Sequence, residues 1–420
     1  MGIKHLHMLL KHTCNESGIY YFPTVTSYLK SEKMRRFKEE VRTKVITNPV
    51  KQMQLKRSIE EKPYFIGIDA YLYASRYKRV FKKIEYGFLK QIMLSLSSKM
   101  IPIYVFDGNA PEQKRYTIEQ RQNKKRRVRE KLEELLVNSY SQYYDMLHMG
   151  DLTFDELMNH IKQLQIPGAF KDDDGMEPNL VANHLLYNST KECDENTLEM
   201  YDEIKRLSKK SISVEYDDIR NLKNFLDLLK IPYVTATEEA DDLMALLYKK
   251  GIINACQSDD MDMLPKGCGN IIQISSDGVC QFILNEILEC LDLTHNQFVD
   301  LCILLGSDYY KIYLPKMKAI DLYNTFKLTP SIEDFVLIYS KIDSKIMLHL
   351  ESYQNTRKSF LLSTEDFDKK LLTIKLGLFD FDTIKNYFDK IGITLDSANK
   401  IKSMIRPINQ FILMLKQSSP

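Results

Sequence analysis

Short apolar runs alternate with longer stretches of helical periodicity, and this alternation limits the fold more than any other feature of the sequence. Runs this apolar suit strands that are covered on both faces, as in a parallel sheet. Helical periodicity, for example over residues 71–96, lies between them. The pattern predicts an α/β fold with a mainly parallel central sheet flanked by helices. The strand-like runs are residues 64–69, 101–107, 231–236, 252–256 and 271–275.

Composition excludes several classes of protein. The 420 residues include 59 Lys and Arg against 57 Asp and Glu, a formal net charge of +2. A uniformly basic nucleic-acid binder is therefore excluded, and any basic surface has to be local. No apolar run approaches the ~18 residues of a membrane span, and no signal-peptide pattern opens the chain, so we expect an intracellular protein that is neither secreted nor membrane-bound. Seven cysteines without a C-x-x-C pair argue against a disulfide scaffold or a zinc ribbon.

Charge is segregated along the chain. Residues 30–62 hold 11 basic and 5 acidic side chains, and residues 114–131 hold 9 basic and 2 acidic ones in a pattern compatible with one helix. Residues 151–203 reverse the balance, with 13 acidic and 3 basic side chains. Local basic surfaces are therefore balanced by an acidic region elsewhere.

Carboxylates follow the apolar runs. Because ligand sites in parallel sheets gather beyond the carboxyl ends of the strands, we expect these side chains to meet in one crevice. The i, i+2 spacing of Asp260 and Asp262 puts both on one face if the chain is extended, and Thr237 is the expected cap of the helix that follows it. The set comprises Asp69, Asp107, Glu239, Asp241, Asp260, Asp262 and Asp308.

Each carboxylate also has a purely structural interpretation. A lone Asp after a strand is more often a turn or cap residue than a ligand, and an acidic first helical turn usually serves the helix dipole. Convergence favours the other interpretation, because crowded carboxylates stay ionised only beside cations. Hard divalent ions, Mg²⁺ above all, prefer oxygen ligands, and the clusters contain no His or Cys for zinc or copper.

The sequence resembles the flap endonuclease and XPG-like family of structure-specific nucleases. The resemblance rests on residues 298–309 (FVDLCILLGSDY), residues 1–3 with Leu6, residues 104–108, and the carboxylate pairs at 239–241 and 260–262. It covers residues 1–12, 64–132 and 230–325, about half the chain. The high usage of Ile, Lys, Tyr and Asn resembles the poxvirus member of the family more than a cellular one.

The resemblance implies the activity and the site. All seven carboxylates fall on the family's metal-binding positions, which implies two Mg²⁺ ions, with Mn²⁺ as a substitute. The implied function is hydrolysis of DNA phosphodiester bonds at 5′ flaps, 5′ ends or branched junctions by a two-metal mechanism, in viral DNA replication, recombination and repair. The alternatives are an RNA-cleaving nuclease of the same superfamily and a catalytically weak DNA-binding scaffold. A poxviral member is expected in the host cytoplasm.

Basic residues after Asp107 match the family's phosphate contacts. Lys114 and Arg121 lie seven residues apart, about two helical turns, and match the catalytic basic pair above the metals; the alternative is a solvated helix face. Gly2 matches a contact near the DNA junction once Met1 is removed, although Met removal alone explains a glycine there. Further DNA-binding positions are Lys124, Lys125, Arg126, Arg127, Arg129, Lys316 and Lys318.

The chain departs from the family pattern in three places. The position expected to stack on a base is Ser75, so stacking passes to Tyr73 or Tyr77 or is lost. The loop after Asp308 lacks the glycines with which the family's helix-turn-helix holds duplex backbone, often with K⁺, which puts K⁺ binding in doubt. No aromatic pair follows residues 410–413, so we find no sliding-clamp motif.

These features divide the chain into four parts. Residues 1–132 form the first part of the nuclease core, with a basic insertion at 13–63 and the start of an arch. Residues 133–229 form the helical arch with the acidic insertion, which is expected to repel DNA and to shield the arch or bind a protein partner. Residues 230–325 complete the core with a degenerate helix-turn-helix region, and residues 326–420 form a helical C-terminal region.

Overall fold

The structure is a computed structural model of the whole chain. It describes residues 3, 5–14, 17–44, 49–81, 83–146, 203–204, 206–208, 210–275, 277–309, 316–329, 331–362, 376–395 and 398–418. Within these ranges no helix combines the length and the apolar character needed to cross a membrane. The described chain forms two compact units, one built from Met1–Leu72, Leu89–Thr117 and Lys223–Pro420, the other from Tyr73–Phe88 and Ile118–Leu222.

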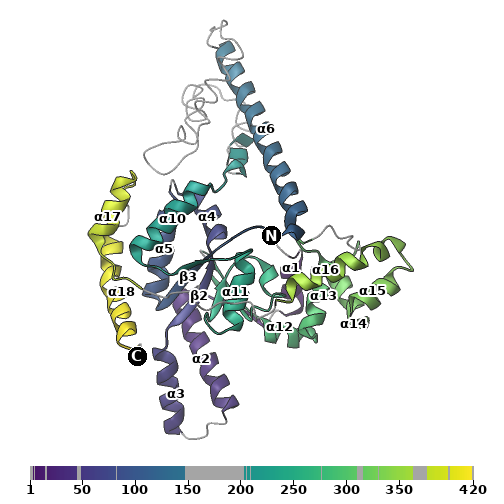
Figure 1. The fold of residues 1–420 in the computed structure, drawn as a ribbon, viewed down its shortest axis with the longest axis horizontal. Helices are drawn as coiled ribbons and strands as arrows, with labels where there is room; N and C mark the ends of the chain where they lie inside the picture. Colours follow the sequence, from purple (N-terminus) through teal and green to yellow (C-terminus); the bar gives the residue numbers. More distant parts are fainter. Residues whose placement is uncertain are drawn as a thin grey trace. The chain divides into compact units, whose positions relative to one another are not determined.

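A seven-stranded sheet forms the centre of the first unit, counted over the described residues (Figure 1). Its order is β1-β7-β6-β5-β2-β3-β4, and the pairs from β6 to β4 are parallel, as predicted. The parallel arrangement brings the carboxyl ends of β5, β2, β3 and β4 to one edge. The strands are β1 (Ile19–Phe22), β2 (Tyr64–Asp69), β3 (Met100–Phe106), β4 (Tyr233–Thr235), β5 (Ala255–Gln257), β6 (Asn270–Ser275) and β7 (Gly278–Ile283).

Two strands were not predicted from the sequence. β7 pairs antiparallel with β6, and β1 pairs antiparallel with β7, so the sheet is mixed at this edge. β1 lies inside residues 13–63, the stretch interpreted as an insertion, and therefore ties that stretch to the sheet. β1 has one buried residue, Ile19, among its four, whereas β7 is buried at Val279 and from Gln281 to Ile283.

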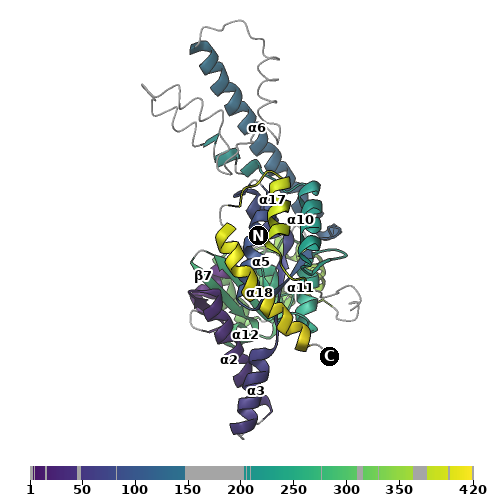
Figure 2. The ribbon, with the colours of Figure 1, turned by 90° about the vertical axis from the view of Figure 1, so that its left-hand side faces the viewer.

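Helices cover the sheet of the first unit. α11 packs on β2, β3 and β5, while α1 contacts α12 and α14. The last turns of α10 meet α17, where Phe225 contacts Tyr387 and Phe388 (Figure 2). Around the sheet and beyond it lie α1 (Leu6–Thr13), α10 (Tyr216–Leu229), α11 (Ala240–Lys249), α12 (Leu284–Leu291), α13 (His295–Leu305), α14 (Ala319–Leu328), α15 (Ile332–Tyr339), α16 (Leu350–Phe360), α17 (Phe381–Lys390) and α18 (Ala398–Ser418), with 3₁₀ turns η2 (Met261–Met263) and η3 (Ser344–His349).

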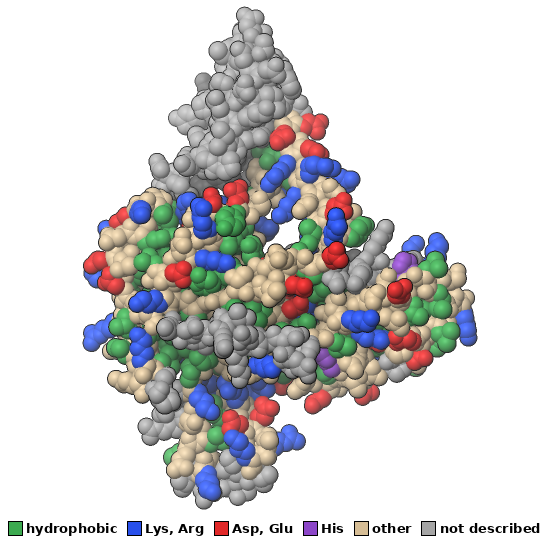
Figure 3. Space-filling model, viewed as in Figure 1, with side chains coloured by type: hydrophobic (Ala, Val, Ile, Leu, Met, Phe, Trp, Pro, Cys, Tyr) green, Lys and Arg blue, Asp and Glu red, His purple; other side chains and the backbone are tan. Residues whose placement is uncertain are grey.

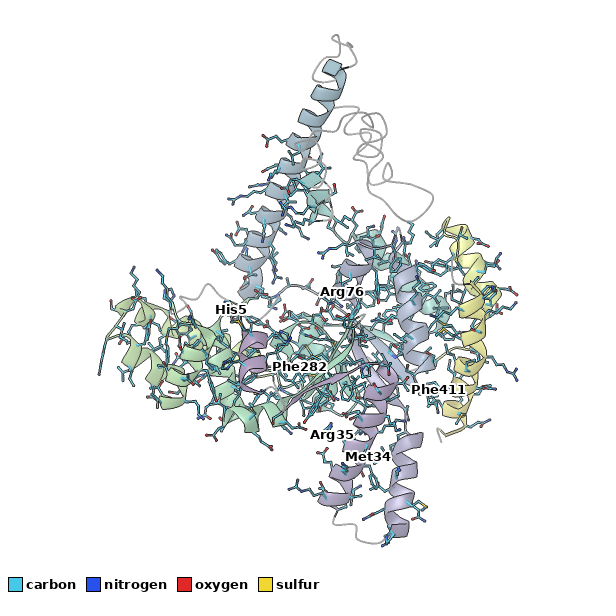
Figure 4. The ribbon with its side chains drawn as sticks, turned by 180° about the vertical axis from the view of Figure 1, so that it is seen from behind. His5, Met34, Arg35, Arg76, Phe282 and Phe411 are labelled. Carbon is cyan, nitrogen blue, oxygen red and sulfur yellow. The ribbon has the colours of Figure 1, made fainter. Side chains whose placement is uncertain are left out.

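The basic stretch forms two helices, α2 (Val25–Thr43) and α3 (Pro49–Glu61), that lie side by side. A buried polar chain anchors α2 to the sheet: Glu32 accepts hydrogen bonds from Arg35 and from Gln281 of β7, and Gln281 also binds Asn270 of β6. Figure 4 shows Arg35 on α2. Lys and Arg side chains are interspersed with Asp and Glu over these helices, at the bottom of Figure 3, rather than forming a continuous basic face.

The second unit holds the long helix α6 (Arg115–Met146) beyond Thr117, together with the end of α4 (Ala70–Lys78) and the start of α5 (Ile84–Ser97). Tyr77 packs among Tyr73, Phe81 and Phe88. A Cβ on Gly87 would come within 2.3 Å of the Tyr77 ring, so this ring needs a glycine beside it. Residues 147–202, which include most of the predicted acidic insertion, lie outside the described residues.

Candidate active site

The first two carboxylates stand where parallel strands end. Asp69 is the last residue of β2, and Asp107 follows the last residue of β3, with Asp69 aligned beside Val105 in the ladder. Each also serves a helix start: Asp69 Oδ1 accepts the Leu72 amide at 2.9 Å, and Asp107 Oδ1 accepts the Ala240 amide at 2.8 Å. The capping interpretation is therefore correct for one oxygen of each side chain, and it does not exclude a further role for the carboxylate.

α11 presents the next carboxylates, and its cap differs from the prediction. The residue before the helix is Glu239, whose side chain makes no capping bond, so Thr237 is not the cap. The capping acceptor comes instead from Asp107, which joins the end of β3 to the start of α11. Gly108 makes this approach possible, because a Cβ there would lie 2.2 Å from the Ala236 carbonyl oxygen.

Asp260 and Asp262 do not lie in extended chain, so the predicted i, i+2 face is wrong. Asp262 belongs to η2, and Asp260 caps that turn by accepting the Asp262 amide at 3.0 Å. The Asp262 residue is fully buried, and both of its carboxyl oxygens lack a hydrogen-bond partner. Burial, reinforced by the charge of Asp260, raises its pKa from 3.8 to about 7.

Asp308 comes from the C-terminal end of α13. The helix stops at Gly306, whose φ of 103° suits a glycine, as the sequence predicted. The Asp308 carbonyl oxygen accepts a hydrogen bond from Thr117 at 2.6 Å, which ties this turn to the first residues of α6. Its charge also acts on Asp262, helping to keep the pKa of that carboxyl raised.

The predicted aspartates lie close enough to raise one another's pKa values. Burial raises the pKa of Asp69 to about 7, with contributions from Asp107 and Asp260. Burial also raises the pKa of Asp241 well above its ordinary value, Asp260 and Asp69 add to the effect, and Lys266 opposes it. The pKa of Asp107 is raised by burial as well, although the Ala240 hydrogen bond opposes the shift. These side chains thus form one electrostatic cluster, which we call the carboxylate cluster. Its members are Asp69, Asp107, Glu239, Asp241, Asp260, Asp262 and Asp308.

The donor chemistry of the carboxylate cluster fits a hard divalent cation. Oxygens are the preferred ligands of Mg²⁺, and both Asp262 oxygens with Asp241 Oδ1 are buried without a hydrogen-bond partner. As they stand, no three Asp, Glu, His or Cys side chains among the described residues converge tightly enough to form a ligand set. Binding an ion therefore requires small side-chain movements, which these unbonded oxygens are free to make.

Two lysines meet the carboxylate cluster. Lys114 Nζ lies 2.8 Å from Glu239 Oε1 and 4.5 Å from the centre of the Tyr309 ring. Lys266 Nζ lies 3.3 Å from Glu239 Oε2, and Tyr309 donates a hydrogen bond to the same oxygen at 3.0 Å. Burial acts to raise the pKa of Glu239, yet the two lysines and Tyr309 together hold it below its ordinary value. Sequence reasoning missed Lys266, whose signal is a single Lys within the otherwise apolar residues 263–268.

The predicted pair of Lys114 and Arg121 does not share one helix. Lys114 ends the 3₁₀ turn η1 (Glu112–Lys114), and α6 begins only at Arg115, so the two-turn spacing argument fails. Arg121 is exposed on α6 in the second unit, as are the predicted phosphate contacts Lys124, Lys125, Arg126, Arg127 and Arg129.

The remaining predicted contacts divide between described and undescribed residues. Lys316 and Lys318 are exposed, and Lys318 directly precedes α14. Gly2 and residues 310–315 lie outside the described residues. Tyr73 is buried and Tyr77 packs in the aromatic cluster of the second unit, which favours loss of the base-stacking contact.

Two family profiles match the parts of the chain that hold this site. The XPG N-terminal domain profile matches residues 46–128, and the XPG I-region profile matches residues 230–308. Asp69 and Asp107 fall in the first match, and the other five predicted carboxylates fall in the second. The matches follow the family's order along the chain. The two matches support an assignment to the flap endonuclease and XPG-like family, whose members are nucleases that hydrolyse phosphodiester bonds.

Individual relatives agree with this assignment. The chain is 24% identical to a probable RAD2-like endonuclease of Invertebrate iridescent virus 6, over 97% of both chains, a viral relative in keeping with the predicted viral affinity. It is 30% identical to flap endonuclease 1-A of Xenopus laevis over 48% of this chain, and this match spans about half the relative's length, 56%.

Solved structures share the fold. The catalytic core of Rad2 in complex with DNA substrate superimposes with a TM-score of 0.55 at 14% identity, covering 97% of this chain and all of that one. Flap endonuclease-1 from Methanococcus jannaschii gives 0.50 at 18% identity, covering 84% of this chain and 94% of that one. The mixed, mainly parallel sheet flanked by helices is thus the fold of this family.

Proposed function

We propose that the chain is a divalent-metal-dependent, structure-specific DNA nuclease of the 5′ flap endonuclease or 5′–3′ exonuclease type. The observation that carries the proposal is the carboxylate cluster: acidic side chains from separate strand ends lie together, with Asp262 oxygens buried and unbonded. Relatives named flap endonuclease, and a Rad2 core solved with DNA substrate, support the same substrate class.

The mechanism we propose uses two Mg²⁺ ions, which supply a nucleophilic water and stabilise the leaving oxygen. Asp69, Asp107, Glu239 and Asp241 would hold mainly one ion, Asp260, Asp262 and Asp308 mainly the other, with Asp241 between them. Mn²⁺ is the expected substitute.

Lys114 has a distinct role in this proposal. Its ammonium group now binds Glu239, and exchange of that carboxylate for the scissile phosphate would place a positive charge where negative charge develops. The same exchange would release one Glu239 oxygen toward the metal-binding set. Arg121 is proposed as the second basic residue at the phosphate.

Cleavage of matched substrates tests the proposal. Wild-type protein should cut a 5′-flap DNA in Mg²⁺, and Asp241→Asn should bind the same DNA without cutting it. Preferential cleavage of a matched RNA would favour the RNA-cleaving alternative. Tight DNA binding without cleavage by the wild type, in both Mg²⁺ and Mn²⁺, would favour the scaffold alternative.

The biological setting is a further part of the proposal. The viral relative supports a role in viral DNA replication, recombination and repair inside an infected cell, in the host cytoplasm if the virus is a poxvirus. The acidic residues 151–203 are proposed to bind a protein partner or to shield the arch, since their charge repels DNA.

A further inference from the structure

Lys266 is a lysine without solvent exposure beside the carboxylate cluster. Its Nζ lies 2.7 Å from Asp242 Oδ1, 3.3 Å from Glu239 Oε2 and 4.0 Å from Asp241 Oδ2. The same atom lies 5.5 Å from the centre of the Tyr309 ring. Burying an ammonium group is costly unless it is paired, and here three carboxylates surround it, from the N-cap and the first turn of α11.

The backbone holds Lys266 in this place. Its amide binds the Asp262 carbonyl oxygen at 3.2 Å, and Cys268 binds the Met263 carbonyl oxygen at 3.0 Å, so the residue belongs to a compact turn directly after η2. Gly267 completes the turn at φ +87°, where a Cβ would also meet the Lys249 side chain at 2.6 Å. The turn that carries Asp262 therefore also delivers the lysine.

Lys266 differs from Lys114 in whether its ammonium group can move away from the carboxylate cluster. The Lys114 side chain is 11% exposed and lies at the start of α6, whereas the Lys266 side chain is completely enclosed. Lys114 can exchange Glu239 for another anion, but Lys266 has no route to solvent without opening the turn. Its positive charge is consequently a permanent part of the site.

We propose that Lys266 is a resident counter-cation of the carboxylate cluster, a positioning residue that stabilises the metal-free site and weakens its affinity for divalent cations. The ammonium group holds Glu239, Asp241 and Asp242 together in the absence of metal. It also repels an arriving cation, because like charges a few ångströms apart interact by several kcal/mol even at an effective dielectric constant of about 20. This inference rests on the proposed metal-dependent function of the same cluster.

Metal binding, measured without reference to cleavage, tests the inference. Lys266→Met should unfold several degrees below the wild type in EDTA, and saturating Mg²⁺ should remove most of that difference. Its half-saturating Mn²⁺ concentration, measured by electron paramagnetic resonance, should fall by about tenfold or more. Lys250→Met, which removes an exposed lysine at the C-terminal end of α11, should match the wild type in all three measurements.

The outcomes separate this inference from the proposed function. Equal loss of melting temperature with and without cation, together with unchanged Mn²⁺ affinity, would show that Lys266 is only structural. Failure of the wild type to bind Mn²⁺ would instead overturn the metal-dependent function itself. If Lys266→Met does not fold, the double variant Asp242→Asn/Lys266→Gln removes the closest ion pair together and should still bind Mn²⁺ more tightly than the wild type; unchanged affinity there would overturn the inference.

Discussion

Two regions of the first unit contain buried carboxylates, and the two regions differ in the hydrogen-bond donors that these carboxylates have. Among the C-terminal helices, Arg357 of α16 binds Asp300 of α13 through two bonds of 2.6 and 2.7 Å and Glu333 of α15 through bonds of 3.0 and 2.9 Å. Asp300 also accepts the Ile332 amide at 3.2 Å, at the start of α15. Every carboxyl oxygen of this ion-pair triad has a donor.

The carboxylate cluster lacks that completeness. Its aspartates outnumber Lys114 and Lys266, and both Asp262 oxygens are unbonded. An uncompensated buried charge costs several kcal/mol, and proteins retain such costs chiefly at functional sites. The triad is therefore a complete structural contact between three helices, whereas the carboxylate cluster keeps buried oxygens without a hydrogen-bond donor, which the proposed cations would supply with a partner.

A pair of matched substitutions gives the largest expected contrast. Asp262→Asn should reduce Mg²⁺-dependent flap cleavage by more than about a hundredfold, since even the outer partners of metal ligands contribute about 10- to 100-fold. The same substitution should leave the metal-free melting temperature unchanged or raised, because it removes an uncompensated charge. Steady-state cleavage and thermal unfolding in EDTA are the measurements.

Asp300→Asn is the matched control, because the substituted residue is equally buried and lies in the same unit. It should lower the free energy of unfolding by about 2 kcal/mol, the value of a charge-assisted hydrogen bond, and leave the cleavage rate intact. If both substitutions lower stability equally and leave cleavage intact, the carboxylate cluster and the triad do not differ in function as proposed.

Lys114→Ala tests whether the more accessible of the two lysines at the carboxylate cluster acts on phosphate. Single-turnover cleavage should slow by about a hundredfold, as for removal of one group that stabilises developing charge, while the dissociation constant for flap DNA changes little. Lys125→Ala on α6 is the control and should weaken binding in a salt-dependent way without slowing the bound complex. A Lys114→Ala effect confined to affinity would contradict the role proposed for it.

Arg357→Ala should show how much the completed triad contributes to stability. Removing the guanidinium leaves Asp300 and Glu333 unpaired, and we expect the free energy of unfolding to fall by about 3 kcal/mol. Arg206→Ala, which breaks an exposed pair with Glu203, should leave it nearly unchanged, because exposed ion pairs contribute little to stability. Equal effects in a urea titration would mean that burial does not distinguish the two pairs.

The sequence was most informative where structure is decided locally. The central strands β2 and β3 were predicted because they are buried on both faces and read as continuous apolar runs. β1 was missed because only Ile19 of its four residues is buried and because it pairs with residues more than 250 positions away, as between Ile19 and Phe282. β7 was missed because Gln281 interrupts its apolar run.

The site, too, was predictable where local sequence patterns decide it and unpredictable where distant residues meet. The cluster of aspartates could be predicted from strand ends, but the partners of each carboxylate could not. The cap of α11 comes from Asp107, 133 residues earlier in the chain, and no local pattern marks that bond. Lys266 was missed because a lysine is almost never fully buried, so a lone one in an apolar stretch is taken as exposed.

The effect of pH on stability should differ in sign between the carboxylate cluster and Glu333 of the triad. Burial raises the pKa of Asp69 and Asp262 from 3.8 to about 7, so between these values the folded, metal-free protein binds more protons than the unfolded chain and loses stability as pH rises. Hydrogen bonds from Arg357 lower the pKa of Glu333 from 4.5 to about 2, so Glu333 contributes stability above pH 4.5 that is lost as pH falls toward 2. Burial raises the pKa of Asp300 in the same triad, although Arg357 opposes that shift.

Melting temperatures in EDTA should consequently fall as pH rises from about 5 to 7.5, a window set by the raised pKa values of Asp69 and Asp262. Asp262→Asn should flatten this decline, because one of the titrating carboxyls is gone. Arg357→Ala should not flatten it, because it removes the group that opposes the raised pKa of Asp300. Mg²⁺ should oppose the decline by binding the ionised carboxylates, since a ligand that binds only the folded state stabilises it. A wild-type decline of the same size in EDTA and in Mg²⁺ would show that the carboxylates responsible do not bind the cation. The carboxylate cluster and the triad would then differ only in how their charges are paired.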